Sequence, residues 1–449
     1  MKWIHFIGGK MKKVDILFIY ETRVRELESI CLLKSEMERR GYTTAILNTW
    51  NEIGHKGYKY NAKVVVAPSM YNDGIFDFVK DLSGNVPKLV NLQWEQIGPV
   101  GDENREDAWY ILKGLAHQCV NICWGDETYN RLLNRAGIDE RHLRKTGQIA
   151  MDFCRPEYSN YYMSREELFN IYNIPNDKEV NLFISSFSYV NLPKTQQEQS
   201  LFTEVDKYIE VSYQSFNGVL NWLDKLLAEH PEQIFVYRPH PAEAENERLK
   251  EMLKKYPNRF FVITELSVKQ WISTADRVYT WFSTATAEAF AFGKPVAILR
   301  PIRMPEEMET MLLQNAKKIE TYEDFALTIK NHFEQALSAE DFERFYLYDD
   351  TPAYVRVSDA IEEVLKDDSY LIVDTRPKKK ESLGMKLKKC GHVVLIGLSK
   401  ILPKQWRFLD KYRQKDNLNE YTKQRQISNY VSQEDIRCMQ ERMQEVFFK

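Results

Sequence analysis

The stretch Phe235–Leu299 decides the fold, and it opens with FVYRPHPAEAE and closes with YTWFSTATAEAFAFGKPVAIL. An apolar run over 234–237 stops at RPHP, residues 238–241. The two prolines on either side of His240 prevent the strand from continuing and also prevent a helix. The pattern therefore predicts a buried strand that ends in a rigid turn carrying a histidine.

A second apolar run in the same stretch predicts another strand with small hydroxyl side chains at its end. Arg277–Trp281 is followed by Ser283 and Thr284, and Ala285–Phe292 has the composition of a helix that the next Gly-Lys-Pro terminates. In open parallel sheets, ligands bind beyond the carboxyl ends of the strands, where helix N-termini favour anions. The two turns are thus candidates to hold a phosphate. The alternative is that His240 and Ser283 only cap helices.

The combination of the two turns resembles a motif pair of a known enzyme family. RPHP followed by S-[ST]-x-x-x-E-A-x-x-x-G-x-P at 283–295 is similar to the C-terminal half of GT-B-fold glycosyltransferases that build bacterial surface polysaccharides. The likeness spans 14–365. It extends to capsule and lipopolysaccharide Kdo transferases, to bacterial sialyltransferases that bind CMP, and to the polyol-phosphate polymerases of teichoic acid synthesis. The Asp/Glu-Asp/Glu-Gly motif of the sialyltransferases is not recognisable, which argues against sialic acid as the donor sugar.

The resemblance implies a metal-independent glycosyltransferase that needs no cofactor. In such an enzyme His240, Ser283 and Thr284 hold the donor phosphate, Arg238 assists them or braces the turn, and Glu288 contacts the ribose. Glu288 also fits a simple helix start. A CMP-sugar such as CMP-Kdo is the favoured donor, and a cell-surface polysaccharide or lipid-linked glycan is the acceptor. The alternatives are a teichoic-acid-type polyol-phosphate transferase, a nucleotide-sugar 2-epimerase and a non-catalytic scaffold for glycan assembly.

The N-terminal part of the chain alternates apolar runs with helical patterns. Val14–Tyr20, a helical pattern over Val24–Arg40 and Thr44–Leu47 form a β-α-β unit. Such alternation predicts a doubly wound parallel sheet. No G-x-G-x-x-G follows the first strand, which argues against a dinucleotide site. Further strands are expected at Val64–Ala67, Leu89–Leu92, Val120–Cys123 and Leu143–Thr146, with helices at Ile75–Leu82, Arg105–Ala116 and Glu127–Ala136.

Two carboxylates of this part are candidate catalytic residues. Glu95 follows the expected strand Leu89–Leu92, and an acid beside Trp94 can have a raised pKa and act as general acid or base. Asp152 ends a T-G-x-x-x-x-D segment that resembles one found at this place in GT-B transferases. Asp152 is a candidate nucleophile, base or N-cap. The alternative to a catalytic role for Glu95 is an ordinary solvated glutamate in a loop.

Changes in composition give the expected domain boundaries. An N-terminal Rossmann-like domain on the acceptor side spans 1–152, a linker rich in prolines and tyrosines spans 153–178, and a second Rossmann-like domain for the nucleotide-sugar spans 179–366. The second domain opens with the strand Val180–Ser185, and Ser186 at its end is a further candidate for the nucleotide site. A basic, partly amphipathic helical tail occupies 367–449. The expected fold class is therefore α/β with two doubly wound parallel sheets.

Composition restricts the compartment and the class of site. The chain has 449 residues, a formal net charge of -3 and six cysteines, which are spread without C-x-x-C pairs. This spacing argues against a zinc site and against a disulfide framework. No run of eighteen apolar residues occurs, and the apolar part of the first residues is short for a signal peptide. We therefore expect a cytoplasmic protein without a bound metal.

The tail carries a strong excess of positive charge. Residues 376–415 contain thirteen Lys and Arg against Glu381 and Asp410, which leaves this segment at +11 and the rest of the chain at -14. Basic residues around an apolar run too short to span a bilayer, here 393–398, are typical of an interfacial anchor on anionic lipid. No nucleic-acid-binding fold accompanies the segment. We expect a peripheral protein on the inner face of the plasma membrane, with packing of the apolar run as the alternative.

Overall fold

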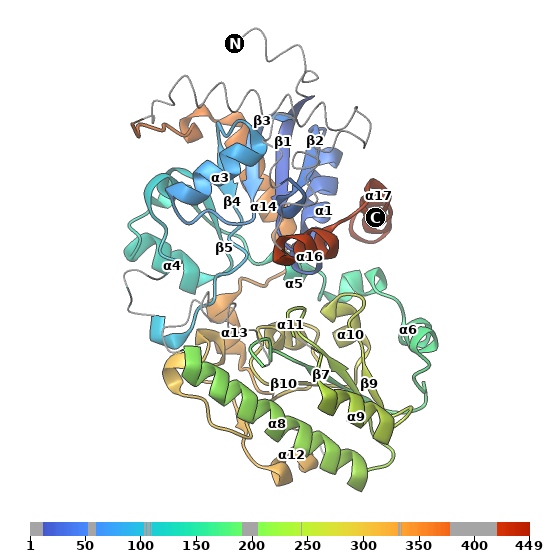
Figure 1. The fold of residues 1–449 in the computed structure, drawn as a ribbon. Coiled ribbons are helices and arrows are strands. Elements are labelled where there is room, and N and C mark those ends of the chain that lie inside the picture. The colour runs from blue at the N-terminus through green and yellow to red at the C-terminus, as the bar shows by residue number, and fades with distance from the viewer. Residues whose placement is uncertain are drawn as a thin grey trace, which may run out of the picture.

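The structure is a computed structural model that shows two α/β domains placed one above the other (Figure 1). It describes residues 12–52, 60–102, 105, 108, 110–190, 205–243, 245–330, 333, 335–377 and 420–449. Each domain contains a parallel sheet of six strands with helices on both faces. The predicted pair of doubly wound Rossmann-like domains is therefore confirmed.

The N-terminal sheet has the strand order β2-β1-β3-β4-β5-β6. Successive residues of β1 point to opposite faces of the sheet, as the pleat requires. Ile16 and Phe18 join the core under α1, whereas Leu17 and Ile19 join the core on the other face. The elements are β1 (Lys12–Tyr20), α1 (Arg23–Arg39), β2 (Thr44–Asn48), α2 (Thr49–Glu52), β3 (Tyr60–Ala67), α3 (Asp73–Ser83), β4 (Leu89–Asn91), β5 (Val120–Cys123), α4 (Asp126–Asn134), β6 (Leu143–Lys145) and α5 (Ile149–Asp152).

The C-terminal sheet has the strand order β12-β11-β10-β7-β8-β9, so β8 and β10 flank the central β7. The strands β7 and β8 are buried along their whole length, and β10 is buried after Arg277, which explains their mostly apolar sequences. The elements are α6 (Arg165–Tyr172), β7 (Val180–Ile184), α8 (Val205–Glu229), β8 (Ile234–Arg238), α9 (Glu247–Lys255), β9 (Phe260–Val262), α10 (Val268–Thr274), β10 (Arg277–Thr280), α11 (Ala285–Ala291), β11 (Val296–Leu299), β12 (Lys318–Ile319), α12 (Tyr322–Thr328) and α13 (Ala339–Phe345).

The chain returns to the N-terminal domain after α13. The backbone passes so close to Gly147 that a Cβ there would lie 2.4 Å from the carbonyl oxygen of Leu347, and Gly147 has φ +86°. The following helix, α14 (Ala353–Lys366), then packs against α1 and β3. The domain boundary predicted at residue 366 therefore counts α14 with the C-terminal domain, although α14 packs against the N-terminal domain. Likewise, α6 of the expected linker contributes Leu168 and Phe169 to the C-terminal core.

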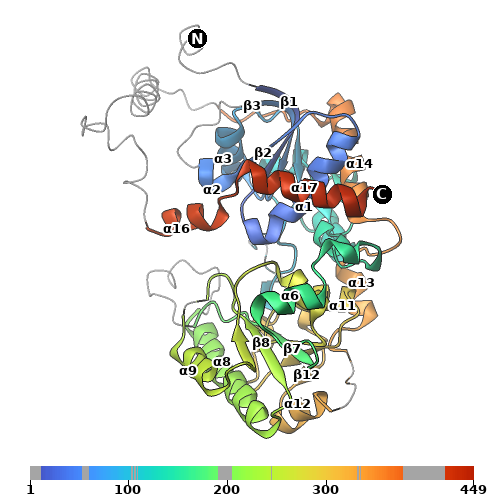
Figure 2. The same cartoon turned by 90° about the vertical axis from the view of Figure 1, so that its right-hand side faces the viewer.

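The last described helices, α16 (Glu420–Asn429) and α17 (Gln433–Phe447), lie against the N-terminal domain (Figures 1 and 2). α17 packs along α1 and adds Ile436, Met443 and Phe447 to the N-terminal core. The ring of Phe447 stacks on Tyr158 with a centroid separation of 4.1 Å. The helical end of the chain that the sequence predicts is present, and this part of it is an integral piece of the domain.

Some expected elements differ from the observed ones. The described residues of the helix expected over Arg105–Ala116 do not form an α-helix, and Gly114–Gln118 is a 3-10 helix instead. The sequence pattern also predicts helices at Tyr322–Ala336 and Asp359–Lys366. The first of these ends early, at Thr328, and the second begins earlier, at Ala353. Among the described residues, no helix combines the length and the apolarity that crossing a bilayer requires.

Candidate functional site at the carboxyl edge of the C-terminal sheet

The turn after β8 is held by the side chain of Arg238. Its buried guanidinium donates to the backbone carbonyls of Ile263, Glu265 and Leu266, and the bond to Glu265 is 2.6 Å long. Burial lowers the pKa of Arg238 to about 10. These contacts tie the end of β8 to the loop after β9. Of the two roles considered for Arg238, its geometry matches the brace of the turn.

Glu243 organises the same turn, and the sequence analysis did not single it out. Its carboxylate accepts from the backbone N–H of His240 at 3.1 Å, from the Tyr237 hydroxyl at 2.8 Å and from the Ser185 hydroxyl. Burial raises its pKa. The carboxylate therefore links the ends of β7 and β8. The available signal was an acid placed three residues after the histidine, where its side chain can bond back to the turn.

The imidazole of His240 lies at the open side of the turn. Its Nδ1 accepts from the backbone N–H of Ala242 at 3.1 Å, so in the neutral ring the proton is on Nε2. Solvent reaches the ring, yet the surrounding protein lowers its pKa to about 4, and the positive charges of Arg25 and Arg425 contribute to this shift. His240 is thus a neutral N–H donor at pH 7.

The predicted hydroxyl residues lie at the ends of the two neighbouring strands. Ser186, after β7, accepts from the backbone N–H of Phe282 at 3.1 Å, which joins this turn to the end of β10. The Ser283 hydroxyl accepts from the N–H of Ala285 at 3.2 Å, and the exposed Thr284 begins α11. Because β7 pairs with both β8 and β10, these turns share one edge of the sheet with the histidine turn.

Glu288 takes part in a buried cluster between the domains. Its carboxylate lies 3.6 Å from the Lys269 ammonium on α10, and the same ammonium lies 3.7 Å from Glu28 on α1. Burial raises the pKa of Glu28. Burial opposes the charge of Lys269, but the two carboxylates outweigh it and raise its pKa. In this arrangement Glu288 links α11 to the N-terminal domain, while its expected contact with a ribose stays a prediction.

Glu95 is held by an ion pair after β4. It is half exposed, and its carboxylate lies 2.5 Å from the guanidinium of Arg25, which also bonds Glu26 at 2.8 Å. Trp94 is buried beside it. The positive charge of Arg25 also contributes to the lowered pKa of His240. The role of Glu95 as acid or base stays a prediction.

Asp152 has a different environment from the other candidates. Its carboxylate is fully buried and accepts from the backbone N–H groups of Ala353 at 2.9 Å and Tyr354 at 2.7 Å, at the start of α14. Arg155 lies 3.1 Å away. Burial raises the pKa of Asp152 to about 6. Asp152 therefore caps the helix that returns from the C-terminal domain, which was one of its three expected roles. The other two roles stay predictions.

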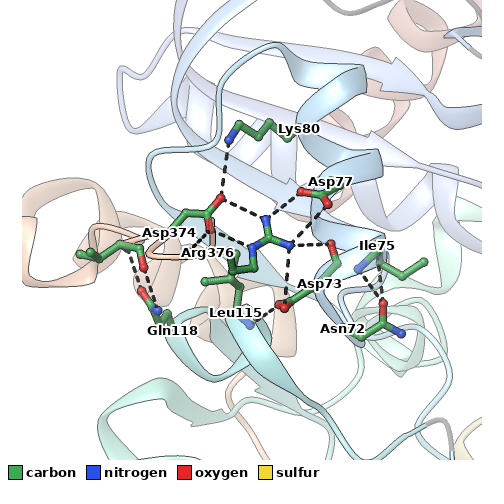
Figure 3. Close-up of polar contacts among 11 residues, drawn as sticks. Asn72, Asp73, Ile75, Asp77, Lys80, Leu115, Gln118, Asp374 and Arg376 are labelled. Carbon is green, nitrogen blue, oxygen red and sulfur yellow. Dashed lines mark hydrogen bonds and ion pairs between the residues drawn. The ribbon is translucent and has the colours of Figure 1, made fainter. Parts of the chain in front are cut away.

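Arg376 marks the start of the basic segment and is fully engaged with acids of the N-terminal domain (Figure 3). Its guanidinium lies 2.7 Å from Asp77, 2.8 Å from Asp374 and 3.8 Å from Asp73. The rest of the segment, 378–415, lies outside the described residues, so its contact with anionic lipid stays a prediction. No group of three or more metal-ligating side chains occurs in the part of the chain that is described.

Two Rossmann-like domains with a returning helix define a GT-B fold. Structures of the wall teichoic acid polymerase TagF share this fold. A variant of the wall teichoic acid polymerase TagF has a TM-score of 0.52 and 13% identity, over 81% of this chain and 92% of that one. The UDP-GlcNAc 2-epimerase of Methanocaldococcus jannaschii has a TM-score of 0.49 and 13% identity, over 78% and 99%. The S. aureus MnaA–UDP co-structure has a TM-score of 0.47 and 16% identity, over 79% and 97%.

At these identities the likeness shows the fold alone. No protein-family model matches the chain, and no curated protein matches its sequence. The finer resemblance to Kdo and other CMP-sugar transferases is not among these similarities.

Proposed function

We propose that the chain is a GT-B transferase that moves a group from a nucleotide-activated donor onto a cell-surface glycan or lipid-linked acceptor. One observation carries the proposal. The turns after β7, β8 and β10 carry Ser186, His240, Ser283 and Thr284 at one edge of the sheet, and the charge of Arg25 in the other domain acts on His240. Neutral hydrogen-bond donors beside a helix start suit a phosphate group.

The chemistry assigned to this site is the stabilisation of a leaving phosphate. The Nε2–H of His240 donates to a phosphate oxygen, and the negative charge that develops when the sugar–oxygen bond breaks remains on the nucleotide. The acceptor hydroxyl forms the new bond to the sugar carbon. Glu95 takes the proton of that hydroxyl once its carboxylate has left Arg25. The exposed pair between Glu95 and Arg25 is of a kind that contributes little to stability, so its exchange costs little.

The favoured donor remains a CMP-sugar such as CMP-Kdo, and we place the protein on the inner face of the plasma membrane through 376–415. A polyol-phosphate transferase is the second candidate. It is favoured by the likeness to the wall teichoic acid polymerase, which was also studied with CDPG. In that reaction the acceptor oxygen attacks phosphorus, and CMP leaves with the charge.

The test is a thermal-shift series with CMP, CDP, UDP and GDP, followed by product analysis with the nucleotide that stabilises the protein. A bound nucleotide raises the melting temperature by mass action. The wild type should respond and His240→Ala should not, while both variants melt alike without ligand. A glycoside product supports the first candidate, and a phosphodiester seen by 31P NMR supports the second. Epimerised nucleotide-sugar without an acceptor, or no stabilisation by any nucleotide, would contradict both.

A further inference from the structure

The C-terminal domain carries a lysine that is buried at its boundary with the N-terminal domain. Lys269 lies on α10, and Figure 1 shows α10 and α11 at the end of their domain that is turned toward the other domain. The Lys269 ammonium lies 3.6 Å from the carboxylate of Glu288 on α11 and 3.7 Å from that of Glu28 on α1. One cation is therefore shared by two carboxylates that belong to different domains.

The members of this cluster differ in their access to solvent. The side chain of Lys269 is only 5% exposed, whereas those of Glu28 and Glu288 are 20% and 16% exposed. Glu288 lies one helical turn beyond Thr284, at the start of α11. A ligand can therefore contact the carboxylate of Glu288 more readily than the ammonium, so Lys269 can act on a ligand through that carboxylate.

The other carboxylate of the cluster connects it to the candidate base. Glu28 and Arg25 are three residues apart on α1, a spacing that makes their side chains neighbours on the helix surface. The guanidinium of Arg25 lies 2.5 Å from the carboxylate of Glu95. A series of contacts thus leads from α11 through Lys269 and the first turns of α1 to Glu95, and it crosses the boundary between the domains.

We propose that Lys269 is a positioning residue of the donor site, whose ammonium fixes the Glu288 carboxylate for the ribose hydroxyls of the nucleotide and ties it to α1 of the acceptor-side domain. This inference rests on the proposed function and on the ribose contact predicted for Glu288. An ionised carboxylate accepts hydrogen bonds from two hydroxyls, and a nearby ammonium favours the ionised form. The same ammonium also compensates Glu28, so the carboxylate that meets the donor and the helix that holds Glu95 keep a fixed relation.

The alternative is that the cluster only holds the two domains together. A second ion pair between the domains provides a matched control, because Arg344 on α13 lies 2.8 Å from Glu127 on α4 and involves neither Lys269 nor Glu288. A purely structural cluster and this pair should respond alike to removal of their cations. A positioning role predicts that only the cluster affects recognition of the ribose.

The experiment measures by calorimetry the binding of CDP and of dideoxy-CDP, which lacks both ribose hydroxyls, to the full chain. The wild type should prefer CDP by about tenfold or more, the gain expected for hydrogen bonds to a charged group. Lys269→Met should lose this preference by weakening the binding of CDP alone, and Lys269→Arg should keep part of it because the charge remains. Arg344→Met should keep the preference of the wild type.

Two further variants keep the test decisive if Lys269→Met does not fold. The double variant Lys269→Met with Glu28→Gln removes the ammonium together with one of the carboxylates that it compensates, and it should also lose the preference. Glu288→Gln keeps the shape of the side chain but removes its charge, and it should bind CDP and dideoxy-CDP alike. Circular dichroism verifies that each variant is folded at the temperature of the measurement.

The outcomes separate this inference from the proposed function. If the variants of Lys269 keep the preference for CDP, if they weaken CDP and dideoxy-CDP equally, or if the wild type has no preference, the inference is overturned. Loss of both ligands in His240→Ala leaves the donor site standing in each of these cases. If His240→Ala binds both ligands like the wild type, or if the wild type binds neither, the proposed function itself fails.

Discussion

The cap that Asp152 places on α14 gives the sharpest stability prediction. Replacing Asp152 by alanine removes the acceptor of two backbone N–H groups, at 2.9 and 2.7 Å, and leaves the buried Arg155 without its nearest carboxylate. A hydrogen bond to a charged group contributes about 1.5–3 kcal/mol, and breaking a buried ion pair costs about 3–5 kcal/mol. These contributions overlap, because one carboxylate makes all the contacts.

We therefore expect Asp152→Ala to lower the free energy of unfolding by about 3–4 kcal/mol. For a domain of this class that corresponds to a fall in melting temperature of roughly 6–15 °C. Differential scanning calorimetry measures the fall, and hydrogen exchange at the amides of Ala353 and Tyr354 shows whether the cap is lost. Asp81→Ala, an equal change of charge at an exposed position on α3, is the control and should melt like the wild type.

The result that would refute this reasoning is a variant of native stability. If Asp152→Ala melts like the wild type, keeps slow exchange at 353 and 354, and loses turnover by ~10²-fold or more, Asp152 is an acid, base or nucleophile. Loss of stability together with loss of turnover supports the capping role instead.

Four further outcomes are expected. Arg238→Ala should destabilise the fold by about 2–4 kcal/mol in urea unfolding, because three backbone carbonyls lose the buried guanidinium that donates to them, and a native midpoint would contradict this. The lowered pKa of His240 favours the folded state only while the ring is neutral in the unfolded chain as well, so this contribution to stability is complete above about pH 6.5 and is lost as the pH falls toward 4. His240→Gln should remove this pH dependence. Lys269→Met should lower the free energy of unfolding by about 3–5 kcal/mol, because it leaves two buried carboxylates without their cation. This loss should be smaller at low pH, because the raised pKa of Glu28 lets that carboxylate take up a proton. A loss that does not change with pH would contradict this. EDTA should leave turnover unchanged, and restoration by manganese after chelation would show that a metal is needed.

Local pattern was enough to predict much of the fold. The apolar runs at β1, β7, β8 and β10 identified buried strands because residues that face a core on both sides are mostly apolar. The RPHP turn was equally predictable, because proline prevents strand and helix through its effect on the local backbone. The helix expected over 105–116 failed because its pattern was compatible with several local structures, and its contacts with the rest of the domain decided among them.

The residues of the candidate site also include some that the local pattern predicted and one that it did not. His240, Ser186, Ser283 and Thr284 follow strand ends, and parallel strands bring such residues to one edge, so sequence order was enough to group them. Glu243 was missed because its bonds to Ser185 and Tyr237 depend on the pairing of two strands. These contacts could not be recognised from the spacing of residues alone.

By itself, the sequence determined which segments are buried, where strands end in polar turns and where positive charge accumulates, because each depends on neighbours along the chain. Only the tertiary structure decided what the charged side chains do. Asp152 finds its partner N–H 201 residues away at Ala353, and Arg425 lies over the Trp50 ring because α16 docks on the N-terminal sheet. The residue type alone does not show whether a carboxylate or a guanidinium caps a helix, forms an ion pair or binds a ligand. Its function follows from the groups that folding brings within a few ångströms.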